Sequence, residues 1–297
     1  MTSNVMQPTI HISRRAVLAD KLKKWAGHTP AYLLLGFWSL FTCFVILWVG
    51  ASSLKTNREL FRDVWSLPAV PRWENYAKAW TTVNMSEYFL NSVQVVLISV
   101  LIVVFISAPV SYVLSRVKFR GSNFLLITFA AGIGVPVQLL FIPLFFILNG
   151  LKINNTLIGL GVIYVSLSIP FTVYMLTGFF GSLPRELEEA AIIDGCTDFQ
   201  VYWKVMFPLA SPGLITASIF NFIGLWNEYQ LALVFINSPD LRTLPLGLYA
   251  LSNAMQYTGD WVGLMAGVVI IMVPTIILYI FLSERMIAGI TMGSVKS

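Results

Sequence analysis

The segment FLNSVQVVLISVLIVVFISAPVSYV, residues Phe89–Val113, contains no charged side chain. An α-helix rises about 1.5 Å per residue, so a segment of this length is long enough to cross a hydrocarbon core of about 30 Å. The segment therefore predicts a membrane-spanning helix.

The rest of the chain has the same apolar character. Hydrophobic residues make up 57% of the sequence and charged residues only 11%, and the mean hydropathy is +0.77, which lies outside the range of water-soluble globular proteins. Five further segments have the length and composition of a span: Ala31–Ser52, Phe124–Leu148, Leu157–Phe180, Leu214–Ile236 and Trp261–Leu282. We therefore expect an all-α, multi-pass integral membrane protein with six transmembrane helices.

The distribution of Lys and Arg predicts how these helices are oriented. Basic residues gather before the first span and between the second and third, at Arg14, Arg15, Lys21, Lys23, Lys24, Arg116, Lys118 and Arg120. Short segments rich in Lys and Arg remain in the cytoplasm during insertion. Because six spans place both termini on one side, we expect both termini in the cytoplasm.

This topology divides the chain into three parts. Residues 1–30 form a cytoplasmic N-terminal tail, residues 31–283 a six-helix transmembrane domain, and residues 284–297 a cytoplasmic C-terminal tail. Within the domain, a loop at about residues 53–88 faces the outside. An acidic loop at about residues 181–213 faces the cytoplasm.

Residues that usually carry enzyme chemistry are scarce. The two histidines, His11 and His28, lie in the N-terminal tail, and Cys43 and Cys196 lie far apart in the sequence. We find no spacing typical of a metal site, a nucleophile with its base, or a phosphate-binding glycine loop. The sequence thus predicts no catalytic residue, no metal, no cofactor in this chain and no nucleic-acid partner.

The acidic loop contains the most polar long stretch in the second half of the chain, LPRELEEAAIIDGCTDFQVYWKVMFPLASPG (residues 183–213). Pro184 suits a helix start, the glutamates that follow suit its first turns, and Gly195 suits its end. A helix is therefore expected over Pro184–Asp194. A second helix is expected from Thr197 or Asp198, either of which suits its N-terminus, to the break at Pro208.

Two readings of this helix–turn–helix elbow remain open from its residues alone. Ala190 and Ala191 leave a surface of small side chains that would let another protein approach closely. An aromatic and apolar flank is expected from Phe199, Tyr202, Trp203 and Met206. The elbow therefore suits a socket on a cytoplasmic partner, or else it rests as an amphipathic helix pair on the lipid headgroups.

The same residues carry a resemblance to a known family. EAAIIDG, followed by VMFP, resembles the EAA loop of binding-protein-dependent ABC importer permeases, with Val205 and Phe207-Pro208 in place of the commoner Ile and Leu-Pro. The stretches SLKTNRELF, LSRVKFRG, LWNEYQLAL and GITMGSVK resemble the sugar-importer branch, which includes the second membrane subunit of maltose-type importers. The resemblance covers almost the whole chain from about Ala31.

The resemblance implies a type I ABC importer permease fold in which the elbow is a coupling helix that docks on a cytoplasmic ATPase subunit. It places the ATPase-coupling residues at Glu188, Glu189, Ala190, Ala191, Asp194, Gly195, Phe207 and Pro208. It also suggests that Met292 and Gly293, in the C-terminal tail, contact the ATPase subunits.

The partners implied by the resemblance are a second related permease subunit, two cytoplasmic ATPase subunits that use ATP and magnesium, and an extracytoplasmic solute-binding protein. The chain itself would be a transport subunit and not an enzyme. Its substrate would be a sugar or oligosaccharide, and its location the cytoplasmic membrane of a bacterium or archaeon, in contact with lipid.

Several polar and aromatic residues in the predicted spans are candidates for lining a solute path, since hydroxyl-rich solutes are held by hydrogen bonds and aromatic rings. They are Gln138, Asn221, Trp226, Asn227, Glu228 and Tyr229. The alternative is that these polar residues join helices within the membrane. The charge of Glu228 would cost roughly 2.5 to 3.5 kcal/mol at mid-bilayer, so we expect this side chain to face protein or water.

Three alternatives to a sugar importer remain open. An ion-coupled secondary transporter would need ionisable groups inside the membrane, and the spans offer essentially one, Glu228. An importer of the same family could carry another solute such as glycerol phosphate. A membrane anchor without transport activity is the third.

Overall fold

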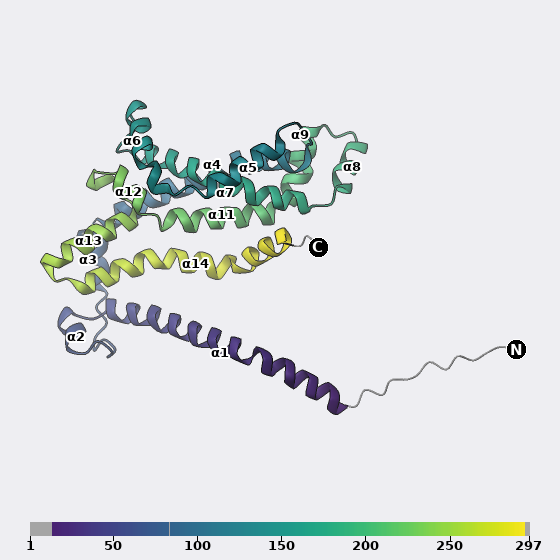
Figure 1. Cartoon of the computed structure of the whole chain (residues 1–297). Helices are drawn as coiled ribbons and strands as arrows, with labels where there is room; N and C mark the ends of the chain where they lie inside the picture. The colour runs from purple at the N-terminus through teal and green to yellow at the C-terminus, as the bar shows by residue number, and fades with distance from the viewer. Residues whose placement is uncertain (1–13, 83, 295–297) are drawn as a thin grey trace.

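The computed structural model describes the backbone of residues 14–82 and 84–294, and the side chains of residues 29–81 and 84–283. Within these ranges the chain forms helices and loops and no strand, as Figure 1 shows. The expected all-α fold is confirmed.

Among the residues that the structure describes, four continuous helices are long and apolar enough to cross a membrane. They are α1 (Arg14–Ser53), α4 (Met85–Arg116), α7 (Leu157–Ser182) and α14 (Trp261–Ser294). Each contains one of the six expected spans. The other two expected spans are not continuous helices.

The predicted span Phe124–Leu148 has the expected length and apolar composition, but it is a bent pair of helices and not one straight helix. The chain instead forms α5 (Ser122–Ile133), then η1 (Val137–Leu140) and α6 (Phe141–Gly150), and the two halves are bent by 98°. Pro136 lies in the break, where its ring disfavours a helical conformation of the residue before it and its nitrogen has no hydrogen to donate.

The predicted span Leu214–Ile236 is also interrupted. Helix α11 (Ser211–Trp226) ends early, and the short α12 (Gln230–Phe235) follows after a break. The preceding segment, Asp198–Leu209, joins α11 at a bend of 68°. That segment comprises α9 (Asp198–Gln200), the π-helical turn η2 (Val201–Met206) and α10 (Phe207–Leu209).

The remaining short helices lie at opposite ends of the long ones. In Figure 1, α2 (Asn57–Arg62), α3 (Glu74–Thr82) and α13 (Leu244–Thr258) lie at the same end as α6 and α12. Helices α8 (Glu186–Ile193) and α9 lie at the other end, toward which the start of α1 and the end of α14 also point. The turn η3 (Pro239–Leu241) precedes α13.

Two hydrophobic clusters hold the helices together. The larger one joins α4, α7, α11, α12, α13 and α14 around the fully buried Trp226, Tyr164 and Phe235. The smaller one joins the ends of α4 and α7 to the elbow through Phe179, Phe180 and Met206. The apolar part of α1 is different, because the chain buries almost none of it, and Leu40 is 74% exposed.

Candidate functional site

The elbow has the local structure expected from its sequence. Glu186, Glu188 and Glu189 occupy the first turn of α8, where the helix dipole favours negative charge. Gly195 adopts the left-handed conformation with φ of +83°, and its N–H donates to the carbonyl of Ile192 at 3.0 Å. The prediction that Gly195 ends this helix is confirmed, and glycine suits the position because a side chain would be strained there.

The second helix of the elbow begins with a capping box. The Thr197 hydroxyl accepts a hydrogen bond from the Gln200 amide, and the Gln200 side chain accepts one from the Thr197 amide at 3.0 Å. These reciprocal bonds satisfy two amides that the helix itself leaves free. The expected cap at Thr197 is therefore confirmed, and the helix continues to Leu209.

The two alanines of the EAA motif face opposite ways. Ala190 is exposed, whereas Ala191 is only 7% exposed and packs in the smaller hydrophobic cluster with Val201 and Tyr202. The expectation that both alanines present a surface to a partner is wrong for Ala191. Its small side chain instead lets α8 lie close to the second helix of the elbow.

The aromatic and apolar flank of the elbow is likewise divided. Phe199 is 73% exposed and Trp203 is partly exposed, but Tyr202 and Met206 are buried in the smaller cluster. The exposed residues of the elbow include Glu189, Ala190, Ile192, Ile193, Asp194 and Phe199. We call this set the outer face of the elbow.

Glu188 does not belong to the outer face. Its Oε1 lies 3.4 Å from Nε of Arg116 at the end of α4, and the Glu188 side chain is only 16% exposed. The predicted contact of Glu188 with an ATPase subunit is therefore not supported, because the side chain points toward its own chain. Phe207 and Pro208 are also predicted ATPase-coupling residues. Phe207 is half-buried beside Trp203, and Pro208 is exposed.

Two of the expected path residues join helices. Asn221 is buried, and its Nδ2 donates to the Thr172 hydroxyl at 2.9 Å, which joins α11 to α7. Trp226 is 1% exposed, and its Nε1 donates to the carbonyl of Ile271 in α14 at 3.1 Å. Both side chains thus join helices, as the alternative expected for intramembrane polar residues describes, and their assignment to a solute path stays a prediction.

Glu228 lies at the break after α11 and stabilises the start of α12. Its carboxylate accepts hydrogen bonds from the Leu231 amide at 2.6 Å, the Ala232 amide at 3.3 Å and the Tyr164 hydroxyl at 2.8 Å. The expectation that Glu228 faces protein is confirmed. Through these three hydrogen bonds, the Glu228 carboxylate holds the start of α12 and Tyr164 of α7 in place at the break that follows α11.

Replacement of Glu228 should therefore lower stability. Glu228→Leu removes the acceptors of two amides and a hydroxyl, and each buried donor left without a partner costs about 1–3 kcal/mol. We expect a clearly lower melting temperature of the purified complex in detergent. Tyr164→Phe, which removes one of these bonds, should show a smaller loss, and Asn237→Leu is the matched control at an exposed position. Equal melting temperatures for Glu228→Leu and the wild type would contradict this role.

A groove of about 450 Å³ opens beside this break and has both aromatic and polar groups in its lining. It is lined by Asn227, Tyr229, Pro245, Leu248, Tyr249, Ser252, Leu264, Val268 and Ile271. The rings of Tyr229 and Tyr249 lie 6.0 Å apart and are inclined by 34°. The groove thus combines aromatic faces with amide and hydroxyl groups, and it includes two of the expected path residues, Asn227 and Tyr229.

Sequence reasoning missed Tyr249 and Ser252 because they lie between two predicted spans. A signal was present, since Pro245, Leu248, Tyr249 and Ser252 follow the spacing of one helix face. Gln138, another expected path residue, lies outside the groove. Its Nε2 donates to Gln230 Oε1 at 3.1 Å and joins the two interrupted spans.

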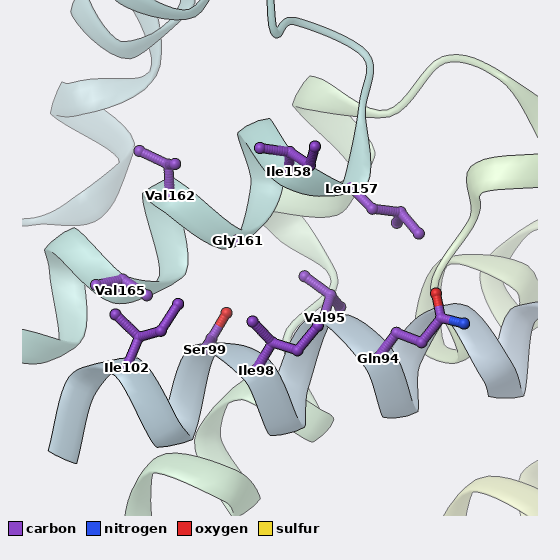
Figure 2. Close-up of a pocket in the computed structure, with 10 residues that line it drawn as sticks. All are labelled: Gln94, Val95, Ile98, Ser99, Ile102, Leu157, Ile158, Gly161, Val162 and Val165. Carbon is purple, nitrogen blue, oxygen red and sulfur yellow. The ribbon is translucent and has the colours of Figure 1, made fainter. Parts of the chain in front are cut away.

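A second hollow, of about 370 Å³, lies between α4 and α7 and is shown in Figure 2. Branched apolar side chains such as Ile98, Ile102 and Val162 line it, and Gln94 and Ser99 are its polar members. A hydroxyl-rich solute would find fewer hydrogen-bond partners there than in the groove beside Tyr249.

Comparisons with known proteins agree with this architecture. Residues 105–290 match the family model described as "Binding-protein-dependent transport system inner membrane component". The chain is 37% identical over 285 residues to the diacetylchitobiose uptake system permease protein NgcG of Streptomyces coelicolor, covering 96% of this chain and 93% of that protein. It is also 37% identical to the probable ABC transporter permease protein YurM of Bacillus subtilis, covering 92% of this chain and 91% of that protein.

A solved structure shows the same fold. A crystal structure of a bacterial ABC transporter involved in the import of the acidic polysaccharide alginate superposes with a TM-score of 0.71 at 22% identity, covering 93% of this chain and 99% of that chain. The type I importer permease fold expected from the EAA loop is thus confirmed. The chain belongs to the family of binding-protein-dependent transport system inner membrane components, and it is a transport subunit and not an enzyme.

Proposed function

We propose that this protein is a permease subunit of an ATP-driven importer of neutral sugars or oligosaccharides. The groove beside the α11 break carries the proposal, because two tyrosine rings, an amide and a hydroxyl line it. Its lining contains no Lys or Arg among the residues the structure describes, which disfavours glycerol phosphate as the solute. Relatives named for diacetylchitobiose, trehalose and arabinooligosaccharide transport support the same substrate class.

The outer face of the elbow is proposed as the docking surface for a cytoplasmic ATPase subunit. Ala190 at its centre allows close approach, and the flanking Glu189 and Asp194 offer negative charge. ATP and magnesium would be bound by two such partner subunits, and a second related permease and an extracytoplasmic binding protein would complete the transporter. Met292 and Gly293, in the last turns of α14, have side chains outside the described residues, and their contact with the ATPase stays a proposal.

The orientation follows from charge. We place the elbow and both termini in the cytoplasm and the loop at about residues 53–88 outside, in the cytoplasmic membrane of a bacterium or archaeon. The cluster of Lys and Arg before the first span and after the second supports this placement. The start of α1, the end of α14 and the elbow share one end of the molecule, as this topology requires.

An ion-coupled transporter is not favoured. The family match argues against it, and Glu228, the main intramembrane carboxylate, is already bound by three donors. A role as an anchor without transport is not favoured either, because the relatives named above are uptake permeases.

Removal of the Tyr249 ring tests the groove. We expect Tyr249→Ala to lower uptake roughly tenfold, because the loss of an aromatic contact of about 1.4 kcal/mol changes a rate by that factor. Uptake would be measured in vesicles containing the complete transporter and its binding protein, with labelled diacetylchitobiose, trehalose, arabinotriose and glycerol 3-phosphate as probes. Tyr257→Ala is the control, since Tyr257 lies on the same helix but is 91% exposed and outside the groove. Unchanged uptake in Tyr249→Ala, or transport of glycerol 3-phosphate alone, would contradict the proposal.

A further inference from the structure

Arg116 is the last residue of α4, and its side chain is only 4% exposed. Its Nη2 donates to the carbonyls of Phe180 and Leu183, each at 2.6 Å. These carbonyls lie at the C-terminal end of α7, where a helix leaves its last acceptors free and where its dipole favours a positive charge. Arg116 thereby joins the end of α4 to the end of α7.

The same guanidinium also contacts the coupling helix α8. Nε of Arg116 lies 3.4 Å from Oε1 of Glu188, and neither atom has a hydrogen-bond partner among the residues the structure describes. Nε of Arg116 and Oε1 of Glu188 therefore face each other, while Nη2 of Arg116 stays bonded to the two α7 carbonyls. Removal of Glu188 would leave Arg116 its bonds to the α7 carbonyls, whereas removal of Arg116 would leave the Glu188 carboxylate without its charged partner.

Apolar contacts hold the same face of α8 beside this ion pair. Ala191 lies three residues after Glu188 and is buried in the smaller hydrophobic cluster with Phe180 and Tyr202. Tyr112, one turn before Arg116, packs its ring 5.1 Å from that of Tyr202 and 5.7 Å from that of Phe180. The inner face of α8 is thus attached to α4 and α7, whereas its outer face remains free for another protein.

The neighbouring basic residues differ from Arg116. Lys118 and Arg120 belong to the same cluster that orients the protein in the membrane, but both are exposed. Arg116 therefore differs from these two residues in its burial and in its contacts with α7 and α8. A positive charge that only orients the protein in the membrane needs neither.

We infer that Arg116 is a positioning residue that fixes the coupling helix to the ends of α4 and α7. When an ATPase subunit displaces α8, the Arg116 contacts transmit the displacement to these two membrane helices. A guanidinium suits this task because its planar array of donors binds two carbonyls and a carboxylate at once, which a lysine ammonium does less well. This inference rests on the proposed docking of the elbow to an ATPase.

The test measures coupling in the complete transporter, reconstituted with its binding protein and ATPase subunits. We expect Arg116→Met to retain the ATPase subunits, because the outer face of the elbow is untouched. The number of sugar molecules imported per ATP hydrolysed should fall about tenfold, and Arg116→Lys should recover part of it. Arg120→Gln is the matched control at an exposed arginine and should keep the wild-type ratio.

Glu188→Gln provides a second variant if Arg116→Met fails to assemble. It removes the ion pair but leaves Arg116 on the α7 carbonyls, so it should assemble and also import less sugar per ATP. A merely structural role would reduce the amount of transporter and leave the ratio unchanged, and that result would overturn the inference. If the wild-type complex itself shows no ATP hydrolysis stimulated by the sugar-loaded binding protein, the proposed importer function fails instead.

Discussion

Ala190→Trp is expected to lower sugar uptake and sugar-stimulated ATP hydrolysis together, by about a hundredfold. Ala190 is exposed at the centre of the outer face, so a large side chain there alters nothing inside this chain. It would, however, overfill a closely fitted socket, and overpacking of a fitted surface costs about 1–3 kcal/mol. Uptake, ATP hydrolysis and retention of the ATPase subunits in detergent would be measured on the same preparation.

The two alanines provide their own control. Ala190→Ser changes little in size and should transport normally. Ala191→Trp should instead destabilise the protein itself, because Ala191 is buried in the smaller cluster. If the elbow merely rested on lipid headgroups, Ala190→Trp would be well tolerated, since tryptophan is favoured at that interface. Normal uptake by Ala190→Trp would remove the docking assignment.

Gly213→Ala is expected to destabilise the protein severely, although only one methyl group is added. Gly213 lies in the first turn of α11, and a Cβ there would overlap the ring of Phe179, which is 2% exposed. The α11 backbone cannot easily move away, because the chain bends by 68° immediately before this helix. The Phe179 ring cannot easily move either, because it is packed in the smaller cluster. We expect about 1–3 kcal/mol of destabilisation, measured as the melting temperature of the purified complex and its level in the membrane.

Gly224→Ala is the matched control, because it makes the same change in the same helix. Apart from the adjoining backbone of α11 and the two neighbouring residues, no atom lies within 4 Å of the position where the new Cβ would stand. Alanine stabilises a helix interior by roughly 0.5–1 kcal/mol relative to glycine, so this variant should be as stable as the wild type or slightly more stable. Similar melting temperatures for Gly213→Ala and Gly224→Ala would contradict the close contact with Phe179.

The sequence predicted what depends on local chemistry. Thr197 and Gly195 mark helix ends through bonds and backbone angles within a few residues, and both positions are confirmed. Long runs such as that of α4 need only length and apolar composition to predict a span. The bends within two spans were not predicted, because an apolar window reports composition and not the direction of the chain. The bend at Pro136 and the end of α11 at Trp226 leave that composition almost unchanged.

The contacts that the sequence did not predict in the candidate site have a different origin. Asn221 and Trp226 look like path residues in sequence because they are polar or aromatic, but their partners Thr172 and Ile271 lie on other helices. The direction of Glu188 likewise depends on Arg116, which lies 72 positions earlier in the chain. Such contacts between distant residues leave no periodic signal in a single sequence.

The early end of α11 has a consequence for the surrounding bilayer. Its 16 residues span about 24 Å, several ångströms less than a typical hydrocarbon core of about 30 Å, whereas the 32 residues of α4 exceed that thickness. Lipid next to a short helix is compressed at a cost of a fraction of a kcal/mol per ångström of mismatch. Any lipid that contacts α11 should therefore be thinner than lipid that contacts α4, and acyl-chain length becomes a variable that acts on this part of the protein without any change in its sequence.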